Sequence, residues 1–235
     1  MKNQYVGDVN DYRKFGLLRG LQSRIGWSML VVWMLTPDDG RNDGSKTDYL
    51  DRPDRWRRYD PKLFDALSSI VHQNGQRTVA ALGELGLLPN ARYFGEPVPR
   101  KTNKRARWLL EVLRQASKAD LVFLDPDNGM EVESVRLGSK NSHKYVYFHE
   151  LSALWFLGRS LLIYQHFPRK QHAIYLYERS QQLIKLLPKA RVTAIKAKSV
   201  AFFLVLQPHH AGRERFWLEE VAAQWKGQLT VSGSP

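Results

Sequence analysis

The residues of this chain that are best placed for chemistry are carboxylates at the end of an apolar segment. Asp125 and Asp127 follow the apolar run Leu121–Leu124, with Pro126 between them and Asn128 after them. The proline fixes the backbone, and two neighbouring carboxylates can hold Mg²⁺, which polarises a phosphate and activates water. A plain strand-end turn is the alternative, because Asp-Pro and Asn-Gly are common turn dipeptides. No cation adjoins Asp125 in the sequence, so its burial is expected to be costly and to indicate chemistry.

A second polar segment follows another apolar run. Thr36–Gly44 comes after Met29–Leu35 and contains Asp38 and Asp39. Ligands of open parallel sheets bind beyond the carboxyl ends of the strands. These carboxylates and Asp125 are therefore expected to border one crevice.

Three histidines are expected in different places, one in the crevice and two at the surface. His166 lies near the end of the apolar run Ser160–Phe167, so it is expected to point into the same crevice. A packed, hydrogen-bonded histidine is the alternative. His209 and His210 follow Pro208 in a predicted loop and are expected at the surface.

Cationic residues gather in three segments. Arg100–Arg107 holds five cations in eight residues, without an acid. Arg52–Tyr59 mixes arginines with aromatic residues, a composition suited to phosphate contact and base stacking. Lys140 and Lys144 flank a polar loop. The candidate nucleic-acid-binding residues are Arg55, Arg57, Arg58, Arg100, Lys101, Lys104, Arg105, Arg107, Lys140 and Lys144.

The charge of the whole chain agrees with this interpretation. The 36 Lys and Arg outnumber the 23 Asp and Glu, which gives a formal net charge of +13 and an isoelectric point near 10.0. Such a balance favours a polyanionic partner, because each neutralised phosphate releases condensed counterions. Solubility alone is one alternative. An acidic membrane surface is a weaker one, because no cationic segment is a clear amphipathic helix. Nucleic acid, DNA or RNA, is the expected partner.

Composition bounds the class of protein. The 235 residues are 43% hydrophobic and 25% charged, which is typical of one folded domain, expected over 1–235 with a helical segment over about 1–25. The absence of cysteine excludes disulfides, thiolate metal sites and a cysteine nucleophile. No apolar signal region and no uninterrupted apolar run of about 18 residues occurs, so we expect a cytoplasmic protein without a membrane span.

Apolar runs alternate with helical patterns, which predicts an α/β fold. The expected strands are Met29–Leu35, Ala91–Gly95, Leu121–Leu124, Ser160–Phe167, Arg191–Ala197 and Val200–Gln207. The expected helices cover 11–21, 62–74, 76–85, 104–117, 171–187 and 213–225. Only Lys198 and Ser199 separate the last two strands, which is too short for a parallel crossover. We therefore predict a mostly parallel central sheet that ends in an antiparallel hairpin, with helices on both faces.

Two stretches resemble a known family. Gly7–Phe15 (GDVNDYRKF) resembles the opening of bacterial large-subunit rRNA adenine-N6 methyltransferases, in which Gly-Asn-x-Ala-Asp-x-x-Lys-His precedes the first strand. Asp125-Pro126 resembles the start of the Asp/Asn/Ser-Pro-Pro-aromatic motif of amino methyltransferases. The closing order of strand, helix, hairpin and helix is similar as well, and three-Cys-motif partner proteins share it. The resemblance covers most of the chain in the order of its elements and implies a Rossmann-like fold.

The resemblance also implies roles for individual residues. In the family, the first side chain of the motif and a proline carbonyl accept hydrogen bonds from the exocyclic amine of a flipped base. The implied catalytic residues are Asp125, Pro126, Asp127 and Asn128. The implied site for S-adenosylmethionine (SAM) contains Lys14, Thr36, Asp38, Asp39 and Gly40. The chain departs from the family where Phe15 replaces a histidine, Asp127 the second proline and Asn128 the aromatic residue. Its loop after the first strand also lacks closely spaced small residues.

Three functions are compatible with these features. The first is a SAM-dependent methyltransferase-like enzyme that acts on nucleic acid. The second is a metal-dependent nuclease or hydrolase that uses Mg²⁺ at the carboxylates. The third is a nucleic-acid-binding protein that retains the fold without the chemistry. For the first, Asp125→Asn is expected to preserve the fold and lower activity by at least roughly a hundredfold.

Overall fold

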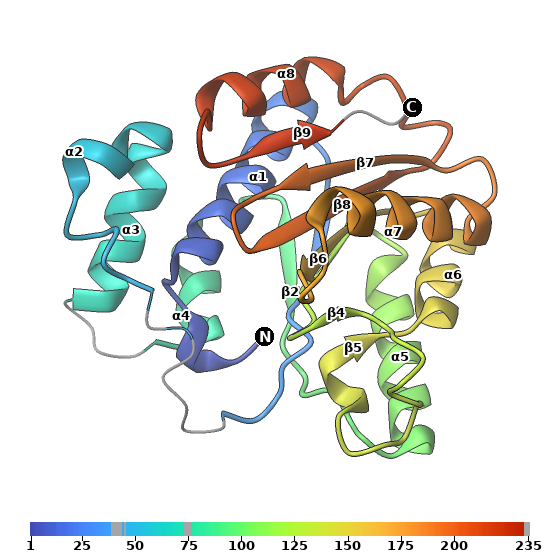
Figure 1. Cartoon of the computed structure of the whole chain (residues 1–235). Helices are drawn as coiled ribbons and strands as arrows, with labels where there is room; N and C mark the ends of the chain where they lie inside the picture. The colour runs from blue at the N-terminus through green and yellow to red at the C-terminus, as the bar shows by residue number, and fades with distance from the viewer. Residues whose placement is uncertain (39–43, 45, 73–76, 233–235) are drawn as a thin grey trace.

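The computed structural model describes residues 1–38, 44, 46–72 and 77–232. Its centre is a seven-stranded mixed sheet with the order β2-β1-β3-β6-β8-β7-β9, and a two-stranded pair, β4-β5, accompanies it. Helices lie on both sides of the large sheet (Figure 1). The α/β class and the helical cover predicted from the sequence are confirmed.

The first four strands of the order form a parallel half-sheet. They are β2 (Ala91–Phe94), β1 (Met29–Val32), β3 (Leu121–Leu124) and β6 (Ser160–His166). Their first residues are in register, so their carboxyl ends reach one edge together. The chain passes from β1 to β2 on one side and then returns to β3 on the other. In α/β folds, ligands bind beside such a reversal, beyond the carboxyl ends of the strands.

The other half of the sheet is antiparallel. Strand β8 (Val200–Leu206) lies between β6 and β7 (Arg191–Lys196) and is antiparallel to both. Strand β9 (Thr230–Ser232) pairs with β7 at the edge. The hairpin predicted from the two-residue link between β7 and β8 is confirmed.

The two faces of the sheet have separate hydrophobic cores. Successive strand residues alternate between them, as in β1, where Val31 belongs to one core and Leu30 and Val32 to the other. On the first face lie α1 (Val9–Ile25), α3 (Pro61–His72), α4 (Val79–Glu84) and α8 (Arg215–Gln224). On the second face lie α5 (Thr102–Ala116), α6 (Phe148–Phe156) and α7 (His172–Leu186).

Helix α1 buries polar residues, which an ordinary surface helix does not. Its N-cap, Asp8, accepts hydrogen bonds from the backbone of Asn10 and Asp11 at 2.7 and 3.0 Å. Asn10, Asp11, Arg13 and Lys14 are all buried. The amino-terminal half of α1 therefore brings charged side chains to the edge of the sheet where the parallel strands end.

Several elements were not predicted. The short ones are η1 (Asn3–Tyr5), α2 (Pro53–Trp56), η2 (Arg57–Tyr59), η3 (Ser142–Lys144), β4 (Gly129–Met130), β5 (Tyr145–Val146) and β9, and the longest is α6. Strand β1 also ends at Val32, earlier than predicted, and Met34 then adopts a positive φ of 46°. Among the described residues, no helix is both long and apolar enough to cross a membrane.

Candidate functional site

A cavity of about 340 Å³ lies at the carboxyl ends of β3 and β6, beside the amino-terminal half of α1. Most of the residues that line it are polar. They are Met1, Tyr5, Asp8, Asn10, Lys14, Gly44, Lys46, Asp125, Pro126, Asp127, Asn128, Tyr164 and His166. The cavity contains all four predicted catalytic residues and Lys14 of the predicted cofactor site.

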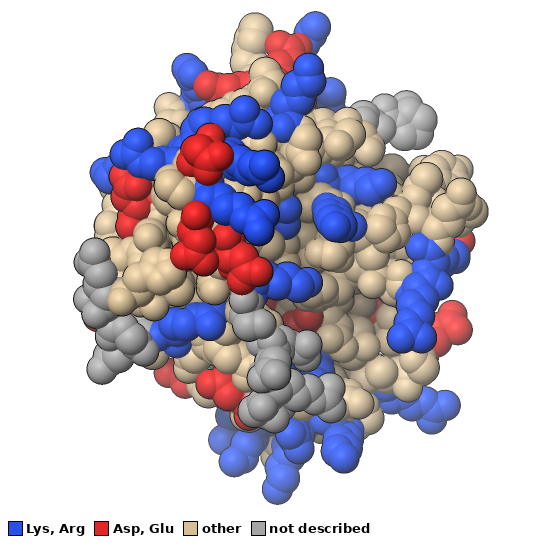
Figure 2. All heavy atoms as spheres, turned by 60° about the vertical axis from the view of Figure 1, so that its left-hand side comes forward, with Lys and Arg blue, Asp and Glu red and all other residues tan. Residues whose placement is uncertain are grey.

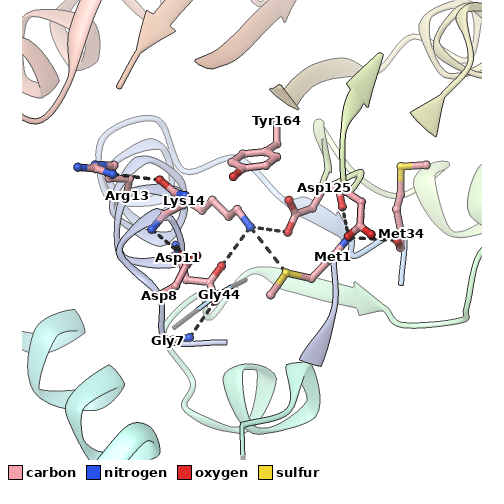
Figure 3. A network of polar contacts seen from close by, with 12 residues as sticks. Met1, Gly7, Asp8, Asp11, Arg13, Lys14, Met34, Gly44, Asp125 and Tyr164 are labelled. Carbon is pink, nitrogen blue, oxygen red and sulfur yellow. Dashed lines mark hydrogen bonds and ion pairs between the residues drawn. The ribbon is translucent and has the colours of Figure 1, made fainter. Parts of the chain in front are cut away.

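Lys14 joins the two stretches on which the sequence interpretation depends. Its Nζ lies 2.8 Å from Oδ2 of Asp125 and 3.1 Å from Oδ1 of Asp11. The ammonium also lies 4.4 Å from the centre of the Tyr164 ring. Figure 3 shows the Lys14 side chain directed at Asp125, beside the Tyr164 ring. Burial disfavours its charged form, but the carboxylates of Asp125 and Asp11 raise the pKa of Lys14 well above its usual value. Lys14 is thus a buried cation in an anionic setting.

This pairing corrects one expectation. Asp125 is buried, with 1% of its surface exposed, but it does not lack a cationic neighbour. The partner comes from α1, more than a hundred residues earlier, and local sequence could not reveal it. Atom Oδ1 of Asp125 forms no hydrogen bond to another described residue, so it remains an acceptor on the cavity wall.

The two acids at the start of α1, Asp8 and Asp11, have raised pKa values. Burial, with a further contribution from the carboxylates of Asp8 and Asp125, raises the pKa of Asp11 to about 7, against the lowering effect of Lys14. Burial likewise raises the pKa of Asp8. Oδ2 of Asp11 accepts a hydrogen bond from the Gly7 backbone at 3.0 Å. Clustered carboxylates with perturbed pKa values are common at functional sites.

Asp127 lines the same cavity and is held by two polar groups. Its Oδ1 lies 2.8 Å from the amino group of Met1, and Thr36 Oγ1 donates to its Oδ2 at 2.6 Å. Burial alone would raise the pKa of Asp127, but the amino group and the Thr36 hydroxyl lower it below its usual value. The amino group of Met1 also donates to the carbonyls of Asp125 and Met34, at 3.0 and 3.3 Å. Thr36, predicted for the cofactor site, therefore contacts a predicted catalytic residue.

The turn that carries these carboxylates is rigid. Gln165 of β6 accepts a hydrogen bond from the Met130 backbone at 2.8 Å and donates to the Asn128 carbonyl at 3.1 Å. Gly129 has a φ of +119°, and a Cβ there would lie 2.2 Å from the Gln165 amide. Only glycine fits this close approach. The backbone of Asn128 also donates to the Lys144 carbonyl at 2.9 Å.

His166 lines the cavity, as its position in the predicted strand suggested. It is also hydrogen-bonded, because its Nε2 lies 3.2 Å from the Tyr164 hydroxyl. Burial, and then the charge of Lys14, lower its pKa to about 4. The imidazole is therefore neutral at pH 7.

Of the other predicted cofactor residues, Thr36 and Asp38 are not among the residues that line this cavity. Asp38 is exposed and accepts a hydrogen bond from the Gln4 backbone at 3.4 Å. Asp39 and Gly40 lie outside the described residues. Sequence reasoning missed Asp8, Asn10 and Tyr164. The signal for the first two was their place within the polar opening segment of α1.

Arg105 was predicted to contact nucleic acid, and this prediction is wrong. Only 2% of the residue is exposed, and its guanidinium forms a two-pronged pair with Glu150 at 2.7 and 2.9 Å. It also donates to the carbonyls of Ser142 and Tyr145 at 2.9 and 2.6 Å. All of its contacts are internal, so no face remains for a phosphate.

The base stacking expected of Arg52–Tyr59 is contradicted for Tyr59, whereas Trp56 is half-buried. Tyr59 is buried and stacks on Trp225 with ring centres 5.3 Å apart. Trp56 packs edge-on against Tyr49 and Tyr59. Both rings pack against the first core, and Tyr59 offers no surface to a base. Arg55, Arg57 and Arg58 themselves are exposed.

The described residues contain no group of three or more histidine, aspartate or glutamate side chains that could hold a metal ion. Asp125 and Asp127 instead have ammonium groups as partners, those of Lys14 and Met1. The arrangement is a pair of neutralised carboxylates with acceptors directed at a small polar cavity.

Comparison of the chain with protein-family models gave no match, and comparisons with curated proteins and with solved structures gave none either.

Proposed function

We propose that this chain is a Rossmann-like, SAM-dependent methyltransferase-like protein that acts on nucleic acid. The single observation that carries the proposal is the 2.8 Å contact between Lys14 and Asp125. The resemblance rests on two short stretches, one at the start of the chain and one after β3. These stretches meet in one cavity, at the sheet edge where α/β folds bind ligands.

The order of the strands adds support. An antiparallel strand, β8, inserted beside the last parallel strand is similar to the way Rossmann-like methyltransferases end. The cavity lies next to the reversal of strand order between β1 and β3.

The donor set fits a cationic cofactor. SAM carries an ammonium and a sulfonium, and the cavity is lined by the carboxylates of Asp8, Asp125 and Asp127. The Asp127 carboxylate already binds one ammonium group, that of Met1, which the ammonium of SAM would replace. The Tyr164 ring accepts a cation on its face. A volume of about 340 Å³ is at the lower end of the range of small-molecule sites, about 300 to 1,000 Å³. Asp127, Asp8 and Asn10 would hold the cofactor in this proposal.

The chain's own residues would prepare the acceptor. SAM supplies an electrophilic methyl group. Lys14 fixes Oδ2 of Asp125 and leaves Oδ1 to accept a hydrogen bond from an amine of the substrate. His166 lines the same cavity and is neutral at pH 7, but burial and the charge of Lys14, which lower its pKa to about 4, make it a weak base. The proton that the amine releases therefore passes to water.

Transfer of a labelled methyl group from SAM to RNA or DNA tests the proposal. Asp125→Asn is expected to lower the rate by at least roughly a hundredfold, the scale of losing one positioned polar group. Asp120→Asn is the matched control, because Asp120 lies at the opposite end of β3. Its rate should stay close to that of the wild type. Thermal melting of both variants checks folding. Equal rates in the two variants, or no transfer by the wild type, would contradict the proposal.

A further inference from the structure

One surface of the molecule holds positive charge that nothing in the described part of the chain neutralises. It is formed by the start of α5 and the segment that contains η3, and we call it the α5–η3 surface. Its cations are Arg100, Lys101, Lys104, Arg107, Arg136, Lys140 and Lys144. No Asp or Glu occurs within 97–110 or within 134–149. None of the seven side chains forms an ion pair with another described residue.

Buried contacts hold the two segments together against their mutual repulsion. Arg105 of α5 donates to the Ser142 and Tyr145 carbonyls and pairs with Glu150. Gly138, with a φ of +86°, approaches Thr102 so closely that a Cβ on it would lie 3.2 Å from the threonine methyl. Arg105 is therefore a positioning residue, since it keeps exposed cations of two segments in one fixed arrangement.

The start of α5 adds to the positive potential. Its N-cap is Lys101, which makes no capping hydrogen bond, and its first turn contains no acid. Most helices place an acceptor or an acid there, because the first backbone N–H groups carry partial positive charge. Lys101 and Lys104 reinforce that charge. Uncompensated repulsion of this kind costs stability in the absence of an anion.

The α5–η3 surface reaches the rim of the cavity. The Lys144 carbonyl accepts a hydrogen bond from Asn128, which lines the cavity. Burial and then the charges of Arg100 and Lys144 lower the pKa of His143, while the Asp127 carboxylate acts in the opposite direction. A chain of phosphates on this surface would lead into the cavity.

The arginines of α2 and η2 form a contrasting region. Within 48–65, five acids balance five cations, Arg52, Arg55, Arg57, Arg58 and Lys62, so the segment has no net charge. Arg57 forms a two-pronged pair with Asp65 at 2.7 Å, and Arg58 donates to the Tyr59 hydroxyl at 3.2 Å. In Figure 2, blue and red spheres alternate over the upper left of the molecule, whereas blue spheres gather at its lower edge.

We propose that the α5–η3 surface binds successive phosphates of the nucleic-acid strand that enters the cavity, and that the α2–η2 segment does not. This proposal rests on the proposed function for one point, that the bound strand delivers a base to the cavity. The binding itself needs no cofactor.

Two triple variants with equal loss of charge test this proposal. The first is Arg100→Gln, Lys104→Gln and Lys140→Gln. The control is Arg52→Gln, Arg55→Gln and Arg58→Gln, which lowers the net charge by the same three units. Fluorescence anisotropy would follow a labelled single-stranded RNA, the DNA of the same sequence and a DNA duplex over a series of salt concentrations.

For a single strand, the first triple variant should lower the slope of log affinity against log salt by about 2, at roughly 0.7 for each lost phosphate contact. Its affinity at low salt should fall by at least about tenfold, and the control should stay close to the wild type. Thermal melting establishes that both variants are folded.

Three outcomes would overturn the proposal. The first is an equal loss of affinity in the two triple variants. The second is that the wild type binds none of these nucleic acids. The third is that the first triple variant binds phosphatidylserine vesicles less tightly than the wild type does but binds nucleic acid equally well. Titration with SAM separates this result from the proposed function. If SAM does not bind but the first triple variant alone loses nucleic acid, the surface assignment stands and the methyltransferase proposal falls.

Discussion

The two ends of the parallel strands hold similar side chains in different states. At the amino ends, Ser160 Oγ lies 2.8 Å from His210 Nδ1, and Asp120 lies 3.9 Å from the other ring nitrogen. Ser160 has no exposed surface and also accepts a hydrogen bond from the Gln207 backbone. His210, predicted at the surface, is buried against Trp27. The group looks like a hydrolytic triad, but its hydroxyl is closed off from substrate.

At the carboxyl ends, the polar groups surround a cavity, and the pKa values of several of them are shifted. The pKa of Asp11 is raised to about 7, mainly by burial, whereas that of Asp120 is lowered through its hydrogen bonds with Ser28 despite partial burial. Side chains that hydrogen-bond one another connect neighbouring strands. Side chains with perturbed pKa values beside a cavity indicate a ligand-binding site. The comparison teaches that residue types alone do not distinguish a site from a structural clasp.

The largest effect is expected at Lys14. Lys14→Met leaves Asp125 and Asp11 buried without their cation, which should cost about 3 to 5 kcal/mol of unfolding free energy. Chemical denaturation measures it, with exposed Lys62→Met as the control. Adding Asp125→Asn to Lys14→Met should recover part of the loss, because the uncompensated charge is removed. A wild-type midpoint for Lys14→Met would show that the carboxylates do not depend on this cation.

A pH-dependent effect of intermediate size is expected at His166. Its folded pKa of about 4 lies below the unfolded value of about 6.5, so the unfolded state binds more protons between these values. Its contribution is therefore complete above pH 6.5 and is lost as the pH falls towards 4, by up to about 3 kcal/mol.

His166→Gln removes this dependence and serves as the reference. The unfolding free energy of the wild type minus that of the variant should rise with pH between 4 and 6.5 and then level off. Asp11 titrates with the opposite sign in this range, but it is present in both proteins and cancels. A difference that stays flat would mean that His166 is accessible to protons in the folded state.

The smallest effect is expected at the amino ends. Ser160→Ala removes the acceptor of the buried Gln207 N–H and the partner of His210, at a cost of about 1.5 kcal/mol. Methyl transfer and SAM binding should remain at wild-type levels. Loss of activity in a variant that melts normally would show that this group is more than a clasp.

The sequence predicts the scaffold of the site better than its contacts. Strand β3 has its predicted bounds, because the apolar run Leu121–Leu124 is buried on both faces and Pro126 follows soon after it. The hairpin follows from its two-residue link. The pairs formed by β4 and β5 are only two residues long, and no periodicity can mark them.

Charged residues were the main source of error, since sequence does not show where a charge finds its partner. Arg105 looks like its neighbours in a cationic run, yet Glu150 pairs with it from 45 residues away. Lys14 and Asp125 are separated by 111 positions. Asp125→Asn, expected from sequence to melt like the wild type, should now also lower stability, because the buried ammonium of Lys14 then pairs with one carboxylate, that of Asp11, instead of two.

The most direct test of the central claim is isothermal titration of SAM and of its demethylated product into three proteins. These are the wild type, Asp127→Asn and Asp120→Asn. The account predicts saturable one-to-one binding by the wild type and by Asp120→Asn. It predicts affinity weaker by about tenfold in Asp127→Asn, the equivalent of about 1.4 kcal/mol for one charged hydrogen bond. No saturable heat in the wild type, or equal affinity in all three proteins, would contradict a cofactor site at the carboxyl ends of the strands.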